Sequence, residues 1–314
     1  MSRASSPALP SSSRAGAVTT AAPAWRVWAA LWIVYLVWGS TYLAIRVMVE
    51  TMPPLLGAGV RFTVAGAVML AVLAVRRSVR PTRAQLLSAL VIGMLLPGAN
   101  AVVTVAEQEV PSALAALLIA SVPLWVLLMR RASGEPVSRA GIAAVLVGFA
   151  GVALLLRPGE QSADASLLAL GAVVFGAIMW ASGSFASPRI RLPGDPLVST
   201  GWQMLLGGAV IVLVGLAVGE AGEVDFDAFS VRSVVAFAYL IVFGSWVAFT
   251  AYAWLLQNAA VSKVATYAYV NPVIAIALGV AFNDESVTAM TLVGAAIIVA
   301  SVALVIRIEN ARRP

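Results

Sequence analysis

The sequence predicts an all-α membrane protein whose ten transmembrane helices form two five-helix repeats of inverted topology. Apolar residues make up 61% of the 314 positions and charged residues only 11%, against roughly 45–50% and about 25% in soluble domains. Charge-poor runs of about 20 residues, the length that spans the hydrocarbon core, recur along the chain. Segments of the two halves also match at a nearly constant offset. These three observations indicate a duplicated, membrane-embedded helical fold.

The charge-poor runs place the helices one by one, between two short tails. Residues 1–24 are rich in Ser, Ala and Pro and are expected to form a disordered cytoplasmic tail. A cleaved signal peptide is not expected, because the first apolar run is longer than a signal core and ends at Arg46. The ten helices are expected near residues 27–45, 55–75, 84–106, 110–129, 140–156, 165–187, 197–219, 233–256, 264–283 and 286–306.

Basic residues determine the predicted orientation. With the N-terminus inside, sixteen of the 20 Lys and Arg residues fall on the inner side, and only Arg46, Arg157 and Arg232 fall on the outer side. Arg61 lies within a span. Because loop Lys and Arg remain in the cytoplasm, both termini are predicted to be cytoplasmic and the protein is expected in the bacterial inner (plasma) membrane.

Internal matches indicate a duplication. An offset of 142 residues aligns Gly59 with Gly201 and Gly66 with Gly208, and an offset of 150 aligns Glu135 with Glu285. The first repeat is expected over residues 27–157 and the second over 165–307, with a cytoplasmic tail at 308–314. Shared composition of Ala-, Val-, Leu- and Gly-rich helices is the competing explanation. Because five is odd, the second repeat must cross the membrane in the opposite sense, as in transporters that bind substrate between their halves.

Composition excludes several classes of function. The chain has neither Cys nor His, so thiol and imidazole catalysis and the usual soft metal ligands are absent. Every Asp lies outside the predicted spans, and no Gly-rich phosphate-binding loop ending in Gly-Lys-Ser/Thr occurs. We therefore predict no enzyme activity, no metal and no cofactor. The net charge of +6 comes from loop arginines without a basic face for nucleic acid, which is not an expected partner.

Polar and aromatic residues within the predicted spans are candidates to line a pathway, because lipid does not solvate polar groups. Arg61 is the foremost candidate, since its guanidinium suits a carboxylate or phosphate; snorkelling to headgroups or a structural pair is the alternative. For the aromatic residues, helix packing is the alternative. The candidate substrate-binding residues are Trp38, Ser40, Thr41, Tyr42, Arg61, Asn100, Glu107, Trp125, Trp180, Ser184, Trp202, Gln203, Trp246, Tyr267 and Asn271.

Two prolines and two glutamates carry more specific expectations. Pro123 and Pro272 are expected to interrupt helices at corresponding positions of the two repeats, a pattern associated with transport sites. Glu107 is also considered as a proton or cation site. Glu109 is expected to stabilise the N-terminus of the helix that follows it.

Four segments resemble the EamA-type transporters of the drug/metabolite transporter superfamily. They are Trp38-Gly39-Ser40-Thr41-Tyr42-Leu43-Ala44-Ile45-Arg46, Pro53-Pro54 leading to Arg61-Phe62, the stretch from Ala106 to Leu118, and Asn271-Pro272. The resemblance covers residues 27–307 and implies a ten-helix fold with a central cavity used mainly for export. The family's Gly-Glu after its fourth and ninth helices appears as Gly134-Glu135, whereas the second half has Asn283-Asp284-Glu285.

The expected function is gradient-driven or exchange export of small metabolites, such as amino acids or related zwitterionic or anionic solutes, by alternating access. Broad-specificity drug efflux is one alternative and a passive channel another. Small multidrug exporters of the superfamily use an acid in their first helix, and no acid lies in this first span, so proton-coupled cation efflux by that route is not expected. The expected partners are the solute and the bilayer, and a monomer is compatible with the sequence.

Overall fold

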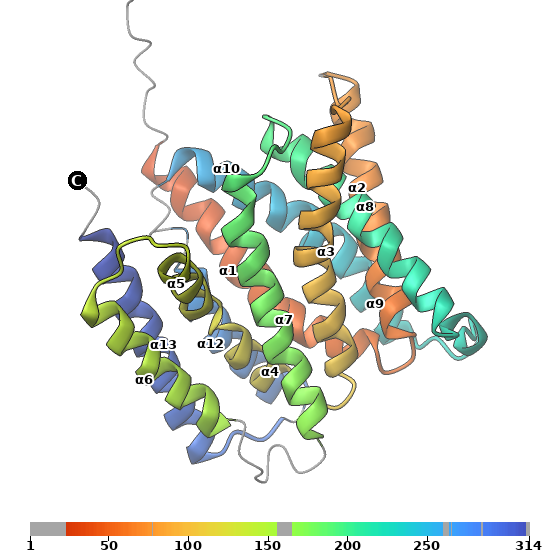
Figure 1. Cartoon of the computed structure of the whole chain (residues 1–314). Coiled ribbons are helices and arrows are strands. Elements are labelled where there is room, and N and C mark those ends of the chain that lie inside the picture. Colours follow the sequence, from red (N-terminus) through yellow and green to blue (C-terminus); the bar gives the residue numbers. More distant parts are fainter. Residues whose placement is uncertain are drawn as a thin grey trace, which may run out of the picture.

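The chain folds into a bundle of helices (Figure 1). The computed structural model describes residues 23–76, 78–155, 165–259, 264, 266–283 and 285–311, and every regular element in these ranges is helical. Eight helical stretches are long and apolar enough to span a membrane, and two shorter apolar helices, Arg139–Leu155 and Val270–Phe282, accompany them. The predicted all-helical membrane class is therefore confirmed. Of the expected N-terminal tail, all but residues 23 and 24 lies outside the described ranges.

The predicted and observed helices correspond along the described chain. The first half contains α1 (Ala24–Met48), α2 (Pro54–Ala74), α3 (Arg83–Ala106), α4 (Ser112–Ile119), α5 (Val122–Ala132) and α6 (Arg139–Leu155). The second half contains α7 (Leu167–Ala186), α8 (Pro196–Ala217), α9 (Val231–Tyr239), a π-helical segment η3 (Leu240–Val247), α10 (Ala248–Asn258), α12 (Tyr267–Phe282) and α13 (Ala289–Asn310), with short 3₁₀ turns η1 (Ser187–Arg189) and η2 (Glu220–Glu223). Helix α13 thus extends into the expected C-terminal tail.

Hydroxyl and carboxyl side chains set where many of these helices begin. The side chain of an N-cap residue accepts a hydrogen bond from a backbone N–H of the first turn, which would otherwise have no partner. Thr82 caps α3 in this way and forms a reciprocal capping box with Gln85. The other N-caps of this kind are Ser138 for α6, Ser166 for α7, Asp195 for α8, Ser230 for α9 and Thr288 for α13.

Carboxylates from distant parts of the chain cap two further helices. Helices α2 and α4 follow prolines, which offer no capping side chain. The Glu220 carboxylate accepts hydrogen bonds from Leu55 N at 3.0 Å and Leu56 N at 2.7 Å. Glu285 accepts from Ser112 N at 2.9 Å and Ala113 N at 3.0 Å. Each carboxylate also favours the positive end of the helix dipole, so tertiary contacts fix these two helix starts.

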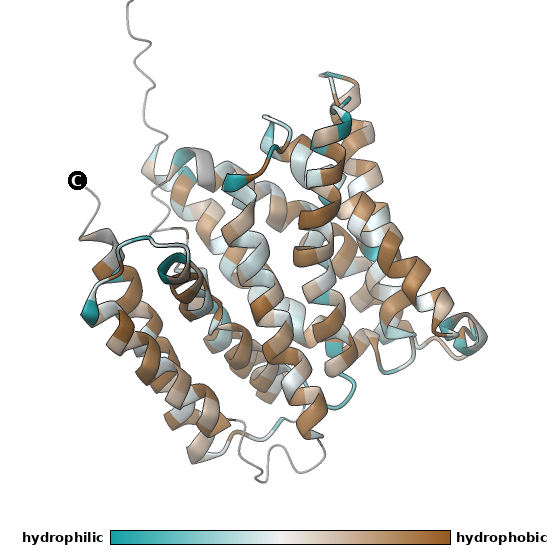
Figure 2. Cartoon of the chain, viewed as in Figure 1, coloured by the Kyte–Doolittle hydropathy of each residue, from teal (hydrophilic) through white to brown (hydrophobic). Residues whose placement is uncertain are grey.

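Helix pairing ties the two halves of the chain together. Helix α2 packs mainly on α8, and α6 packs on α13, while α1 contacts α12 and α10, and α3 contacts α7 and α8. Figure 1 shows α6 beside α13 at one edge and α2 beside α8 at the other. Figure 2 shows hydrophobic residues along the helices and hydrophilic ones concentrated near their ends. The apolar outer faces are suited to lipid, and each half buries its inner faces against the other.

Glycines allow α2 and α8 to approach until their backbones touch. A Cβ added to Gly66 would lie 2.7 Å from Gly201 O, and one added to Gly59 would lie 3.1 Å from Gly208 O. Such small residues permit the close packing on which helix association in lipid depends. The contacts are also reciprocal: Gly59 corresponds to Gly201 and Gly66 to Gly208 at the 142-residue offset, so each glycine meets the counterpart of the other.

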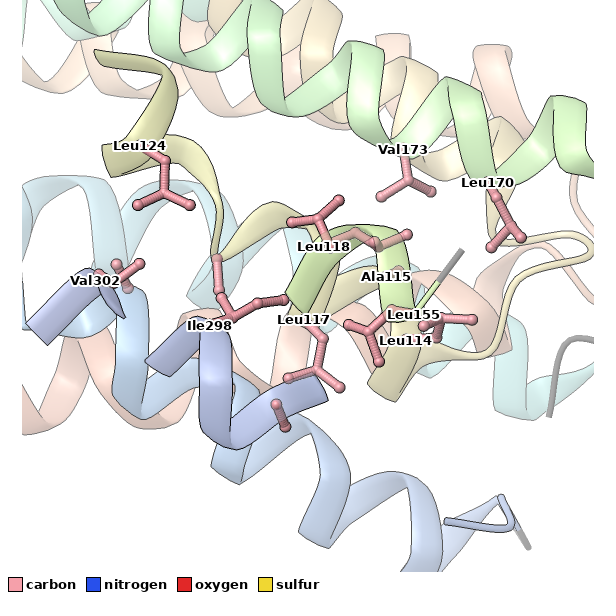
Figure 3. Close-up of a cluster of buried hydrophobic side chains, with 14 of the residues drawn as sticks. Leu114, Ala115, Leu117, Leu118, Leu124, Leu155, Leu170, Val173, Ile298 and Val302 are labelled. Atoms are coloured by element: carbon pink, nitrogen blue, oxygen red, sulfur yellow. The ribbon is translucent and has the colours of Figure 1, made fainter. Parts of the chain in front are cut away.

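The largest apolar cluster lies around α4 and joins it to α6, α7 and α13. Figure 3 shows Leu117 and Leu118 of α4 among Leu170 of α7 and Ile298 and Val302 of α13, all of them buried. Because lipid tails are as apolar as leucine, this cluster stabilises the bundle by close packing and not by removal of surface from water.

The prolines do not produce the paired helix breaks that the sequence predicts. The helix before Pro123 does end, since α4 stops at Ile119 and α5 starts at Val122. Pro272, in contrast, lies inside α12, which continues from Tyr267 to Phe282. Pro272 removes only one N–H, and the flanking hydrogen bonds maintain the helix. The expectation of matching interruptions is therefore wrong for the second repeat.

Candidate functional site

A cavity lies where helices of both halves converge. Its unfilled volume is ≈ 800 Å³, including the space at its mouth, and residues of α1, α2, α3, α4, α5, α7, η3, α10 and α12 line it. The walls are mostly apolar, as in most small-molecule sites. Eight of the predicted residues contribute to the lining: Trp38, Thr41, Tyr42, Arg61, Asn100, Trp180, Tyr267 and Asn271.

Arg61 is the charged residue of the lining. Its side chain is 2% exposed. The Nε atom donates to Ser245 Oγ at 3.1 Å, and the guanidinium carbon lies 4.4 Å from the centre of the Phe62 ring. Nη1 has no hydrogen-bond partner, and no carboxylate among the described residues lies within ion-pair distance. Arg61 therefore does not snorkel toward headgroups in this structure, but presents an unused donor within the bundle.

Trp38 is the centre of an aromatic wall. Its ring centre lies 5.0 Å from that of Tyr252, 5.3 Å from those of Phe249 and Tyr267, and 6.2 Å from that of Trp180. Most of these rings meet edge to face, the arrangement that aromatic quadrupoles favour. Trp38 itself is 8% exposed. The wall joins α1 to α7, α10 and α12 and provides a rigid apolar surface.

Two asparagines add polar points. Asn100 Oδ1 is buried without a hydrogen-bond partner. The Asn271 amide, with its nitrogen turned toward backbone carbonyls, donates to Tyr267 O at 3.2 Å and to Tyr35 O at 3.3 Å. Asn271 thus joins α12 to α1, whereas Asn100 keeps an acceptor unused. A buried polar atom without a partner costs about 1–3 kcal/mol, so a ligand that supplies a donor to Asn100 and an acceptor to Arg61 gains binding energy.

Glu107 lies just beyond this lining, at the C-terminal end of α3. Its side chain is fully buried, and neither carboxyl oxygen has a hydrogen-bond partner. Electrostatic interactions connect it to Tyr42 and Arg61, both of which line the cavity, and to Arg46 and Glu285. Glu107 is therefore electrostatically coupled to the site.

The remaining predicted residues are placed elsewhere. Trp125 packs on Phe149 with ring centres 4.5 Å apart, and Trp246 is 36% exposed on the π-helical segment. The others make local or structural hydrogen bonds: Ser40 with Val37 O and Tyr239 Oη, Ser184 with Trp180 O, Trp202 with Val79 O, and Gln203 with Ser199 Oγ. The structure does not bring these six residues into the cavity lining.

The structure also adds residues that no sequence pattern singles out. Phe249 and Gly244 line the cavity, and Ser245 holds Arg61. Gly244 and Ser245 lie on η3, whose π-helical turns often occur at functional sites. A π-helical segment inside an apolar run has no composition signal of its own, so only the backbone geometry shows it.

Glu109 stabilises a different helix from the one predicted. Its Oε2 accepts a hydrogen bond from the N–H of Ser166, the N-cap residue of α7, at 3.0 Å. Hydrogen bonding by the Ser166 side chain, and then by its backbone N–H, lowers the pKa of the Glu109 carboxyl. The N-terminus of α4, which follows Glu109 in sequence, is capped by Glu285 instead. The expectation that Glu109 stabilises α4 is therefore wrong, because its carboxylate bonds to Ser166 and a carboxylate distant in sequence caps α4.

Long apolar helices around a cavity with a buried guanidinium define a membrane-protein class, and comparison with known proteins gives its family. The profile of the EamA-like transporter family matches residues 25–157 and again 167–307. The chain belongs to this family of membrane transporters.

Sequence relatives agree with that membership, and a solved structure shares the fold. The chain is 38% identical to the uncharacterized inner membrane transporter YedA of Escherichia coli K12, over 88% of this chain and 89% of that protein. It is 26% identical to the uncharacterized transporter YvbV of Bacillus subtilis, over 88% and 90% of the two chains. A crystal structure with 23% identity superimposes with a TM-score of 0.62 and covers 91% of this chain and 99% of its own, which shows the shared fold.

Proposed function

We propose that this protein is a secondary transporter that moves small zwitterionic or anionic metabolites, such as amino acids, by exchange or down a gradient through alternating access at the central cavity. The observation that carries the proposal is the Arg61 guanidinium, buried with Nη1 unused beside an aromatic wall. A guanidinium binds carboxylates through a two-pronged pair of hydrogen bonds. Aromatic rings supply contact surface for the rest of the solute.

Ten spans in two inverted repeats are part of this proposal. The family profile matches twice, and the two shorter apolar helices bring the candidate spans to the expected number. The exchanged glycine contacts of α2 and α8 have a parallel in α6 and α13. Ser301 Oγ donates to Ala144 O, and a Cβ on Gly151 would lie 3.2 Å from Gly294 O. At the 150-residue offset Ala144 corresponds to Gly294 and Gly151 to Ser301, so these contacts are also reciprocal.

Counterflow in proteoliposomes tests the transport function. Vesicles are loaded with unlabelled amino acids and other carboxylates, and uptake of each labelled counterpart is followed. We expect saturable exchange of at least one solute, and its loss in Arg61→Gln but not in Arg80→Gln, which removes the same charge from an exposed loop position. Arg61→Lys keeps the charge without the planar fork and should restore exchange only in part.

Other outcomes of the same assay identify the alternatives. Flux that does not saturate and does not exchange would indicate a passive channel. A wild-type protein that exchanges none of the panel but exports apolar aromatic compounds would indicate broad-specificity drug efflux through the same aromatic wall. Exchange that is unaffected by Arg61→Gln would overturn the role of Arg61.

Orientation is tested by labelling. The proposal places the protein in the bacterial inner membrane with both termini in the cytoplasm, which the name of the Escherichia coli relative supports for the membrane. Because the sequence has no Cys, a single introduced Cys is the only residue that a thiol reagent can label. A membrane-impermeant thiol reagent should label Ala221→Cys from outside, but Ser78→Cys only after the membrane is opened. The reverse pattern would invert the topology.

A further inference from the structure

Glu107 is buried in an environment that gives its charge little support. It is the C-cap residue of α3, where the helix dipole carries partial negative charge and disfavours an anion. Both carboxyl oxygens are buried and have no hydrogen-bond partner. An ionised carboxylate in such a place costs far more than a neutral one, because nothing replaces its lost hydration. The side chain therefore fits this structure best when it holds a proton.

The two arginines that interact with Glu107, Arg46 and Arg61, donate their hydrogen bonds to other groups and not to its carboxyl. Arg46 Nη1 donates to the backbone carbonyls of Glu107 and Gln108, which closes the C-terminal end of α3. Arg61 directs Nε to Ser245. Both positive charges act on Glu107 through space and favour its ionised form, while the carboxylate of Glu285, held at the start of α4, opposes it. Tyr42 of α1 is a further titratable group that interacts with Glu107.

Arg61 connects this carboxyl to the cavity. Nη1 of Arg61 and both oxygens of Glu107 lack hydrogen-bond partners, although the two side chains interact electrostatically. An ionised Glu107 would draw the guanidinium toward itself and occupy the donor that a solute needs. A neutral Glu107 leaves the guanidinium charge uncompensated, and an anionic group of the solute can then neutralise it.

We propose that Glu107 is a proton-binding site, and that its protonation frees Arg61 for the acidic group of the solute, so that proton and solute are carried together. This rests on the transport function proposed above. The carboxylate of Glu107 and that of the solute compete for one guanidinium. In a solute-free return step, Glu107 loses its proton and pairs with Arg61, which keeps the buried charge neutralised while the cavity is empty.

Infrared spectroscopy of the purified protein tests the proton site without any solute. A protonated carboxyl gives a carbonyl stretch that an ionised one lacks. We expect this band at neutral pH in the wild type, its loss in Glu107→Gln and its retention in Glu109→Gln, the matched change at an exposed carboxyl two positions away. A band that survives in Glu107→Gln, or its absence from the wild type at neutral pH, would overturn the assignment.

Transport assays then test coupling with whichever solute the counterflow panel identifies. We expect Glu107→Gln, a permanent mimic of the protonated form, to keep counterflow but to lose accumulation driven by a pH gradient, and its exchange rate to lose the pH dependence of the wild type. Glu109→Gln should behave as wild type. Wild-type pH dependence in Glu107→Gln would refute the coupling alone, whereas a wild type that exchanges none of the panel would refute the transport proposal.

Discussion

The seam between α2 and α8 and the cavity beside it are both buried, but they differ in how completely their polar groups are satisfied. In the seam, glycines bring backbones into contact and leave no space. In the cavity, Arg61 and Asn100 retain unpaired atoms. Both regions use residues of α2, with Gly59 and Gly66 on one side and Arg61 on another. One helix thus anchors the fold by tight packing and presents an unsatisfied group for binding.

The largest expected effect breaks the seam. Gly66→Leu would force a Cβ to 2.5 Å from Leu205 N and 2.7 Å from Gly201 O, both backbone atoms that cannot move aside. We expect the free energy of unfolding to fall by more than the roughly 1–3 kcal/mol that overpacking typically costs. Little folded protein should then remain in detergent. Size-exclusion profiles and thermal melts measure it. Gly171→Ala, at a helical glycine with nothing within 4 Å, should melt at or above the wild-type temperature.

A substitution in the cavity should have the opposite sign. Arg61→Met keeps a similar volume but removes a buried cation with an unmade hydrogen bond, so we expect the free energy of unfolding to rise by about 1–3 kcal/mol. Counterflow of every solute with a carboxylate should disappear. Thermal melting tests the gain in stability, and counterflow measured on the same preparation tests the loss of transport. A less stable Arg61→Met would show that the guanidinium has a structural role.

A smaller effect is expected for a predicted site residue that lies outside the lining. Trp202 donates its indole Nε1 to Val79 O at 2.8 Å, which fastens α8 to the segment after α2. Trp202→Phe keeps most of the packing and loses this bond, at a cost of about 1 kcal/mol. Thermal melting should show that small loss, and the concentration dependence of exchange should stay unchanged. An altered substrate affinity would place Trp202 in the pathway after all.

The smallest effect concerns the loop cluster of Glu135, Arg130 and Arg189. The hydrogen bond from Arg130 Nε, at 2.6 Å, holds the pKa of Glu135 below its ordinary value of 4.5, and Arg189 acts in the same direction. A depressed folded-state pKa means that the stabilisation is complete above the unfolded-state pKa and disappears as pH falls through the folded-state value. As the pH is lowered, the melting temperature of Glu135→Gln should fall less steeply than that of the wild type. High salt should shrink the difference, because these groups are partly exposed.

Much of the fold followed from the sequence because the bilayer restricts the possible structures. Backbone groups in lipid must bond within a helix, so each charge-poor run of adequate length predicts one helix. Residues 84–106 and 197–219, for example, correspond to α3 and α8 to within a few residues. Pro123 predicted the interruption between α4 and α5. The π-helical η3 was missed, because it does not change the hydrophobic pattern.

The candidate site was harder to predict, and the two repeat-related positions Arg61 and Gln203 show why. Both are polar residues in apolar helices at equivalent positions, yet Arg61 lines the cavity and Gln203 bonds to Ser199 of its own helix. The sequence gives the cost of a polar group in lipid but not which neighbour satisfies it. Phe249 was missed for the converse reason, since an aromatic residue in an apolar run carries no polar signal.

The sequence by itself determined the solvent of this protein, the approximate positions of its apolar helices in the described chain, and the duplicated pattern of its halves, because these depend on composition and on spacing along one chain. Only the tertiary structure decided which helix faces meet. That choice makes Glu285 the cap of α4, brings Gly59 to Gly208, and leaves the Arg61 and Glu107 side chains with unpaired atoms. Contacts between residues far apart in sequence depend on how side chains of several helices pack together, and no single segment encodes that.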